Sequence, residues 1–111
     1  MTENGLVYSR RFDGNGGGAE LDWDGIAAHR TGDGLLWVHL VHGHEQAHRW
    51  LFQESGVEEL TATALVADET RPRLRVDGES LFMILRGVNL NPGRDPDDMV
   101  SLRMLLQPDR I

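Results

Sequence analysis

Apolar residues fall into short, nearly continuous runs near both ends of the chain, and such runs predict strands. Residues 35–41 form a nearly continuous apolar run, which is typical of a strand buried on both faces. Residues 80–88 are apolar at five successive positions. The run at 80–88 is expected to be a central strand. Shorter apolar segments next to turn-forming residues predict further strands at residues 5–12, 19–23, 73–76 and 99–106.

The middle of the chain has the spacing of amphipathic helices. Ala47, Trp50 and Leu51 lie at positions i, i+3 and i+4, so residues 45–54 are predicted to be a helix. A second helix is predicted at residues 57–65, where apolar and small side chains again form one stripe. Residues 24–30 have no clear period and are assigned at most one helical turn.

Turn signals indicate how these elements connect. Asp77 and Gly78 form the strongest hairpin signal in the chain. The glycine-rich residues 13–18 predict a flexible loop between two strands, and no Gly-Lys-Ser/Thr follows them, so they do not match a phosphate-binding loop. The order of strands, helices and strands predicts an α/β protein, with residues 1–111 forming a single domain. This domain is expected to hold a mixed, mostly buried β-sheet with helices packed on it.

Composition excludes several classes of function. The 111 residues have a formal net charge of -7, which opposes binding to nucleic acid or anionic lipid, because such binding needs clustered basic residues. The chain has no cysteine, which removes disulfides and thiolate metal sites. No run of about 20 apolar residues is present, and no signal peptide is visible. Taken alone, the chain is expected to be a soluble intracellular protein.

Histidines form the sharpest cluster of candidate ligands. His39, His42, His44 and His48 lie close together in sequence, and His44 and His48 share one face of the predicted helix. Neutral imidazoles bind zinc, copper and nickel, so His42, His44 and His48 are a candidate metal site. The alternative is that they are ordinary surface residues. His39 is expected to be a hydrogen-bonded strand residue.

Other polar features have simpler structural explanations. Asp95, Asp97 and Asp98 could bind a hard cation, but the spacing of a calcium-binding EF-hand is absent, so a solvated loop is predicted. Arg86 ends an apolar run and would need a charged partner if buried, for which Glu69 and Asp98 are candidates. No Walker motif, Rossmann fingerprint, Gly-x-Ser-x-Gly or His-Glu-x-x-His occurs, so the chain is not predicted to be an enzyme.

Several stretches of the chain form distinctive sequence motifs. The most specific is Arg-Gly-Val-Asn-Leu-Asn-Pro-Gly, at residues 86–93. Asp-Glu-Thr-Arg-Pro-Arg at 68–73, Asp-Pro-Asp-Asp-Met-Val-Ser-Leu-Arg at 95–103 and Leu-Asp-Trp-Asp at 21–24 add to it. Together these stretches resemble the cytoplasmic domain of ZntB-like members of the CorA family of metal-ion transporters. The resemblance is strong over about the last fifty residues and looser before them.

This resemblance implies more than the chain itself contains. Members have an N-terminal α/β cytoplasmic domain, a stalk helix and two membrane helices, and they assemble as homopentamers around a pore marked by Gly-Met-Asn. Residues 1–111 would then be the cytoplasmic N-terminal domain, truncated before the stalk and membrane helices. The chain also stops just after a turn at 108–109, where a further strand could begin, which agrees with truncation.

The function expected from this resemblance is that of a soluble domain of a divalent metal, or zinc, ion transporter. The domain would lie on the cytoplasmic face of the inner membrane, as a scaffold and candidate ion-sensing or gating module. Its partners would be the remainder of the transporter and divalent cations, with no nucleic acid. No cofactor is required, although zinc or another divalent cation could bind. The alternative is a free-standing metal-binding module built on the histidine cluster.

Overall fold

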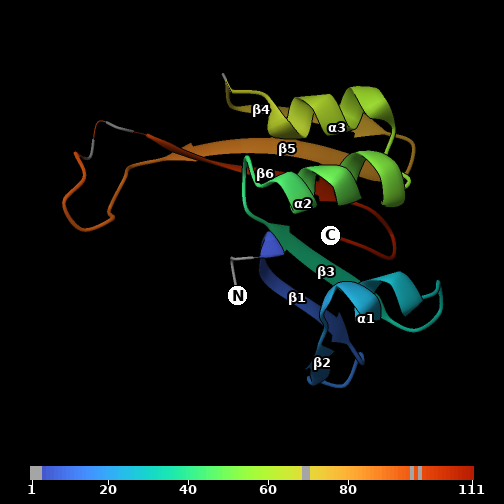
Figure 1. The fold of residues 1–111 in the computed structure, drawn as a ribbon. Helices are drawn as coiled ribbons and strands as arrows, with labels where there is room; N and C mark the ends of the chain where they lie inside the picture. Colours follow the sequence, from blue (N-terminus) through green and yellow to red (C-terminus); the bar gives the residue numbers. More distant parts are fainter. Residues whose placement is uncertain (1–3, 69–70, 96, 98) are drawn as a thin grey trace.

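The computed structural model describes residues 4–68, 71–95, 97 and 99–111. Its strands and helices follow one another in the order that the sequence predicts, with one additional helix, α1, near the N-terminus (Figure 1). In chain order they are β1 (Leu6–Phe12), β2 (Gly18–Glu20), α1 (Trp23–Ala28), β3 (Leu35–Leu40), α2 (Glu45–Arg49), the π-helical segment η2 (Trp50–Glu54), α3 (Glu59–Val66), β4 (Arg73–Asp77), β5 (Ser80–Gly87) and β6 (Val100–Leu106).

The strands form two antiparallel sheets of three strands each. The first has the order β2-β1-β3, and in it Arg10 of β1 pairs with Glu20 on one side and Trp37 on the other. The second has the order β4-β5-β6, so β5 is the central strand, as its apolar run predicted. A tight turn joins β4 to β5, and Gly78 adopts a φ of 59° there, which glycine tolerates best.

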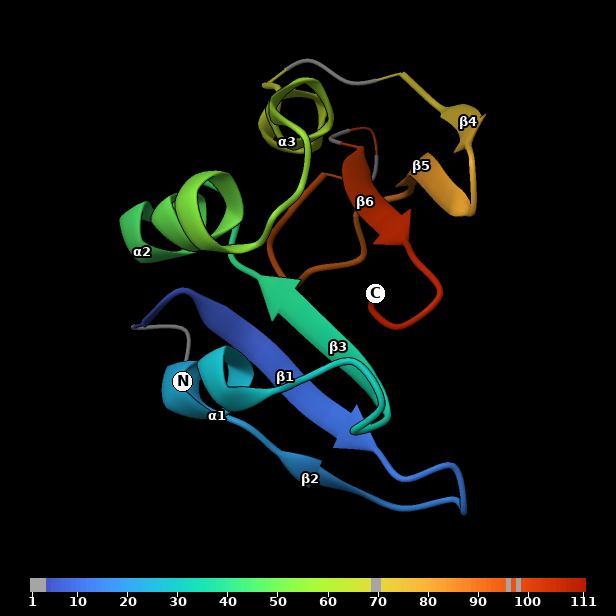
Figure 2. The ribbon, with the colours of Figure 1, turned by 90° about the vertical axis from the view of Figure 1, so that its right-hand side faces the viewer.

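The C-terminal residues add a parallel neighbour to the first sheet. After β6 the chain turns at Gln107–Arg110, where the two residues exchange backbone hydrogen bonds. The chain then runs beside β3, and Leu36 forms a parallel bridge with Arg110. In Figure 2 the C-terminus accordingly lies between β6 and β3. β3 is therefore flanked by an antiparallel and a parallel neighbour.

The helices lie together on one side of the two sheets (Figures 1 and 2). Asp22 begins α1, because its side chain accepts a hydrogen bond from the backbone N–H of Gly25 at 2.8 Å. Two arginines of the second sheet hold α3. Arg103 donates to the carbonyl oxygen of Leu65 at 3.0 Å, and Arg75 donates to the Thr61 hydroxyl at 3.2 Å.

The core fills the space between the helices and the inner faces of the sheets. Ala62 of α3 is fully buried, and Ile84 of β5 is 2% exposed. Trp23 and Trp50 pack with ring centroids 5.8 Å apart, which joins α1 to the α2–η2 stretch. The main buried cluster consists of Leu6, Ile26, Leu36, Trp50, Leu51 and Ala62.

The α/β class is confirmed, while several details differ from the sequence prediction. The strands form two sheets rather than one. β3 is not buried on both faces, since Trp37 is 39% exposed and His39 is also exposed. The strand predicted at 19–23 is shorter, because Asp22 caps a helix and Trp23 starts α1. Within the described ranges, no helix has both the length and the hydrophobicity that crossing a bilayer requires.

Candidate functional site

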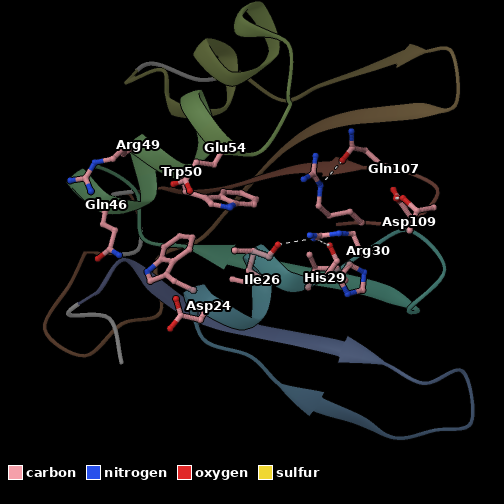
Figure 3. Close-up of a pocket in the computed structure, with 15 residues that line it drawn as sticks. Asp24, Ile26, His29, Arg30, Gln46, Arg49, Trp50, Glu54, Gln107 and Asp109 are labelled. Carbon is pink, nitrogen blue, oxygen red and sulfur yellow. Dashed lines mark hydrogen bonds between the residues drawn. The ribbon is translucent and has the colours of Figure 1, made fainter.

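A groove of about 650 Å³ lies between α1, the α2–η2 stretch and the C-terminal residues (Figure 3). Trp23 and Trp50 contribute aromatic walls, and Leu36 of β3 contributes an apolar side chain. The volume lies within the range of ordinary ligand pockets, roughly 300–1,000 Å³. These residues are far apart in sequence, so periodicity alone gave no signal for the groove.

The charged residues around the groove are balanced in sign. Arg30, Arg49 and Arg110 line it, together with the carboxylates of Asp24, Glu54 and Asp109. Arg30 is already engaged, since its guanidinium donates to the backbone carbonyl oxygens of Ala27 and His29. The groove therefore has no net charge that would select a free cation or anion.

Arg110 has contacts with both Trp50 and Gln107. Its guanidinium lies 5.7 Å from the centre of the Trp50 ring, and its Nε donates to the side-chain oxygen of Gln107 at 2.9 Å. Burial lowers the pKa of Arg110 below its ordinary value, and the nearby Asp109 carboxylate opposes that shift. These contacts fix the C-terminal turn against η2.

The three histidines proposed as metal ligands have separate local contacts. His44 begins α2, and its Nδ1 accepts a hydrogen bond from the Gln46 backbone N–H at 3.1 Å. His42 Nε2 lies 3.2 Å from the carbonyl oxygen of Val66, which places it against the end of α3. His48 stacks on Phe52 with ring centroids 4.3 Å apart.

The described residues contain no group of three His, Asp or Glu side chains placed to hold a metal ion. His42, His44 and His48 are therefore not brought together as a ready ligand set. A metal site there would need each imidazole to leave its present contact, and it stays a prediction. His29, which the sequence gave no reason to select, lines the groove with both ring nitrogens buried and unpaired among the described residues.

The other polar features agree with structural roles. Asp95 accepts a hydrogen bond from the backbone N–H of Asp97 at 3.0 Å, which is a local turn within a loop. Arg86 is exposed at the end of β5, so it does not carry the cost of burial that would demand a partner. Its proposed partners, Glu69 and Asp98, lie outside the described residues.

Comparison with known proteins assigns the fold to a class. Among solved structures, full-length CmaX superimposes with a TM-score of 0.85 and 39% identity, over 96% of this chain and 33% of that chain. The ZntB cytoplasmic domain from Vibrio parahaemolyticus gives a TM-score of 0.77 and 27% identity, over 96% of this chain and 42% of that chain. The fold is therefore that of a domain found in ion-transport proteins.

Sequence comparison agrees and identifies the family. The divalent cation transporter CmaX of Pseudomonas aeruginosa is 40% identical over 111 residues, which is 98% of this chain and 33% of the relative. The zinc transport protein ZntB of Yersinia enterocolitica is 30% identical over 100 residues, or 90% of this chain and 30% of the relative. The family model for CorA-like Mg2+ transporter proteins matches residues 32–111. This chain belongs to the CorA-like Mg2+ transporter family.

The chain spans about a third of the length of the curated relatives that it matches. The resemblance to ZntB that the sequence motifs predicted is confirmed. CmaX is a second relative, and its sequence is more similar to this chain than that of ZntB from Yersinia enterocolitica. The names of both relatives describe transport rather than an enzymatic reaction.

Proposed function

We propose that this chain is the N-terminal cytoplasmic domain of a divalent cation transporter. The observation that carries the proposal is the match to CmaX, which extends over 98% of this chain and is reproduced in three dimensions with a TM-score of 0.85. The cytoplasmic location is supported by the ZntB structure, which is described as a cytoplasmic domain and covers nearly the same residues. In the complete protein this domain lies at the inner face of the membrane.

The partners in this proposal are the remainder of the transporter and other copies of it. A stalk and membrane helices supply the pore, and the complete protein assembles as a homopentamer. The transported ion is a divalent cation. Zinc is a more specific proposal for the transported ion. It is supported by the name of the ZntB relatives, whereas CmaX is named only for divalent cations. No resident cofactor is required for this role.

The proposed role of the domain is that of a scaffold and an ion-responsive gating module. The formal net charge of -7 attracts cations to the surface weakly, which supports a response to cytosolic ion concentration. A cation that binds one arrangement of neighbouring domains better than another shifts the population between them, and the pore follows. The competing function, a free-standing metal-binding module, needs a ligand set that the described residues do not form.

The coding sequence beyond Ile111 tests the first part of this proposal. It is expected to encode two apolar segments of about 20 residues each and a Gly-Met-Asn. A stop codon directly after Ile111 would contradict the assignment.

Reconstitution tests the transport activity. The complete protein is placed in liposomes that contain a fluorescent divalent-cation indicator, and Zn2+ or Mg2+ is added outside. Uptake above that of empty liposomes supports a transporter, and the relative rates identify the preferred ion. Rates equal to those of empty liposomes for every divalent cation tested would reject it. If the domain gates the pore in response to the ion, the uptake rate changes when the same cation is first added to the side of the liposome membrane on which the domain lies.

A further inference from the structure

The chain contains two Asn-Gly pairs, Asn4-Gly5 and Asn15-Gly16, and their surroundings differ sharply. An Asn-Gly pair is chemically labile, because glycine has no side chain to shield its backbone nitrogen from the preceding Asn side chain. Both glycines have a φ of 89°, so this angle does not distinguish the two pairs. The difference lies in the contacts that hold each pair in place.

Asn15-Gly16 lies in the exposed loop between β1 and β2. In both views this loop is at the end of the molecule farthest from the second sheet (Figures 1 and 2). Asn15 and Gly16 are both exposed, and a Cβ placed on Gly16 would meet no heavy atom within 4 Å apart from those of its chain neighbours. The side chain of Asn15 therefore has room to turn toward the backbone nitrogen of Gly16.

The peptide group that joins Asn15 to Gly16 has no hydrogen bond among the described residues. The bonds that shape the loop lie on either side of it. Asp13 Oδ1 accepts from the backbone N–H of Asn15 at 2.7 Å and from that of Gly17 at 3.1 Å. The backbone N–H of Asp13 donates to the Gly17 carbonyl oxygen at 3.0 Å. Rotation of the peptide group between Asn15 and Gly16 thus costs no hydrogen bond of its own.

Asn4-Gly5, by contrast, is held at its peptide group and at its side chain. The Asn4 carbonyl oxygen accepts a hydrogen bond from Trp23 Nε1 at 2.8 Å, and Asn4 Oδ1 accepts from the Leu6 backbone N–H at 3.1 Å. Gly5 is buried, and a Cβ placed on it would lie 2.8 Å from Nδ1 of His44. A reaction that turns the Asn4 side chain toward the Gly5 nitrogen has to disrupt these contacts.

We propose that Asn15 is a site of spontaneous deamidation, whereas the fold blocks the same reaction at Asn4. The backbone nitrogen of Gly16 loses its proton to hydroxide and attacks Cγ of Asn15. A bond forms between these two atoms, and the bond from Cγ to the side-chain nitrogen breaks. That nitrogen takes up a proton and leaves as ammonia, which gives a succinimide. Water then opens the ring at either carbonyl carbon, and the product is aspartate or isoaspartate.

This modification changes both the charge and the backbone of the loop. Either product replaces a neutral amide by a carboxylate, which adds negative charge to a chain whose formal net charge is already -7. Isoaspartate also lengthens the main chain by a methylene group, inside the loop that the Asp13–Gly17 bond closes. The inference concerns residues of this chain alone and does not depend on the transport function proposed above.

Peptide mass spectrometry of the complete protein tests the inference. The protein is incubated at mildly alkaline pH, either native or in urea, and is then digested with trypsin, which cleaves after arginine. The digest separates residues 1–10, in which Asn4 is the sole amide side chain, from residues 12–30, in which Asn15 is. The mass change from amide to carboxylic acid in either segment therefore identifies the residue that reacted. Asn15→Gln is the control, because its longer side chain keeps the amide but closes the ring less readily.

In native protein, Asn15 should lose its amide at least about tenfold faster than Asn4, because only Asn4 requires the structure around it to open. In urea the two residues should react at similar rates. Equal native rates would overturn the inference, as would an Asn15 rate that rises in urea as steeply as that of Asn4. Asn15→Gln should abolish the rapid mass change in residues 12–30, and a change that persists in this variant would also contradict the proposal.

Discussion

The backbone N–H of Ile111 donates to the carbonyl oxygen of Leu36 at 2.8 Å, and the N–H of Val38 donates to the carbonyl oxygen of Ile111 at 2.8 Å. These bonds make the C-terminal residues a parallel neighbour of β3. The turn at 107–110 also keeps the same segment close to the end of β6. A strand extended from Ile111 would lie between β3 and β6 and join the two sheets into one mixed sheet.

Amide hydrogen exchange tests this extension. The N–H groups of Leu36 and Val38 point toward the C-terminal segment, and alternation along a strand directs the N–H of Leu40 the same way. We expect the Leu40 amide to exchange at least about tenfold more slowly in the complete protein than in the 111-residue chain. The Trp37 amide, which faces β1, is the control and should change little. Equal Leu40 rates in the two proteins would contradict the extension.

Arg103 links β6 to the end of α3 through its bond to the Leu65 carbonyl oxygen at 3.0 Å. Removing that charged donor should lower the free energy of unfolding by about 1–3 kcal/mol, because a carbonyl at the helix end loses its partner. Arg103→Ala is compared by urea denaturation with Arg94→Ala, whose side chain is exposed in the loop before β6. A loss for Arg103→Ala no larger than for Arg94→Ala would show that the bond does not support α3.

Much of this fold could be predicted from the sequence, because local patterns decide most of its elements. The continuous apolar run at 80–88 correctly predicted a central strand, and the spacing of Ala47, Trp50 and Leu51 predicted a helix that the structure continues through η2. The family motifs were sufficient to identify the relatives. These successes share one feature, namely that the signal lies within a single segment.

The errors come from information that one segment does not contain. α1 was read as at most one turn, since its helical stretch is short and its start depends on the Asp22 cap. The apolar run at 35–41 predicts burial on both faces, but such a run does not identify the segments that would cover it, and Trp37 is exposed. The groove was missed because its walls come from both ends of the chain, including Trp23 and Arg110.

Zinc titration tests the histidine site that the sequence predicted. Since His42, His44 and His48 have separate contacts, we expect calorimetry on the 111-residue domain to give the same heats for the natural sequence and for His42→Ala/His48→Ala. His44 is left in place because it caps α2. A binding isotherm present in the natural sequence and lost in the double variant would establish a histidine metal site after all.

Asp13 carries a pH-dependent interaction in the loop between β1 and β2. Hydrogen bonds from the backbone N–H groups of Asn15 and Gly17 lower its pKa below the ordinary value, so the ionised form is favoured in the folded state. Because the pKa is lowered, ionised Asp13 stabilises the folded state at pH values above its unfolded-state pKa. This stabilisation is lost as the pH falls through the folded-state pKa. Titration by NMR should therefore give a lower pKa for Asp13 in the folded protein than in urea. Matching values in the two states would contradict the interaction.

Ile84 and Leu85 are neighbours on β5 that point to opposite faces, and they offer a paired test of packing. Ile84 is 2% exposed on the buried face of β5, while Leu85 is 46% exposed on the opposite face. In the 111-residue domain, Ile84→Ala should cost about 2–5 kcal/mol of unfolding free energy because it leaves a core cavity. Leu85→Ala should stay within about 1 kcal/mol, since little of its contact with water changes. Urea denaturation followed by tryptophan fluorescence measures both free energies of unfolding, and equal losses for Ile84→Ala and Leu85→Ala would show that the two faces of β5 do not differ in packing.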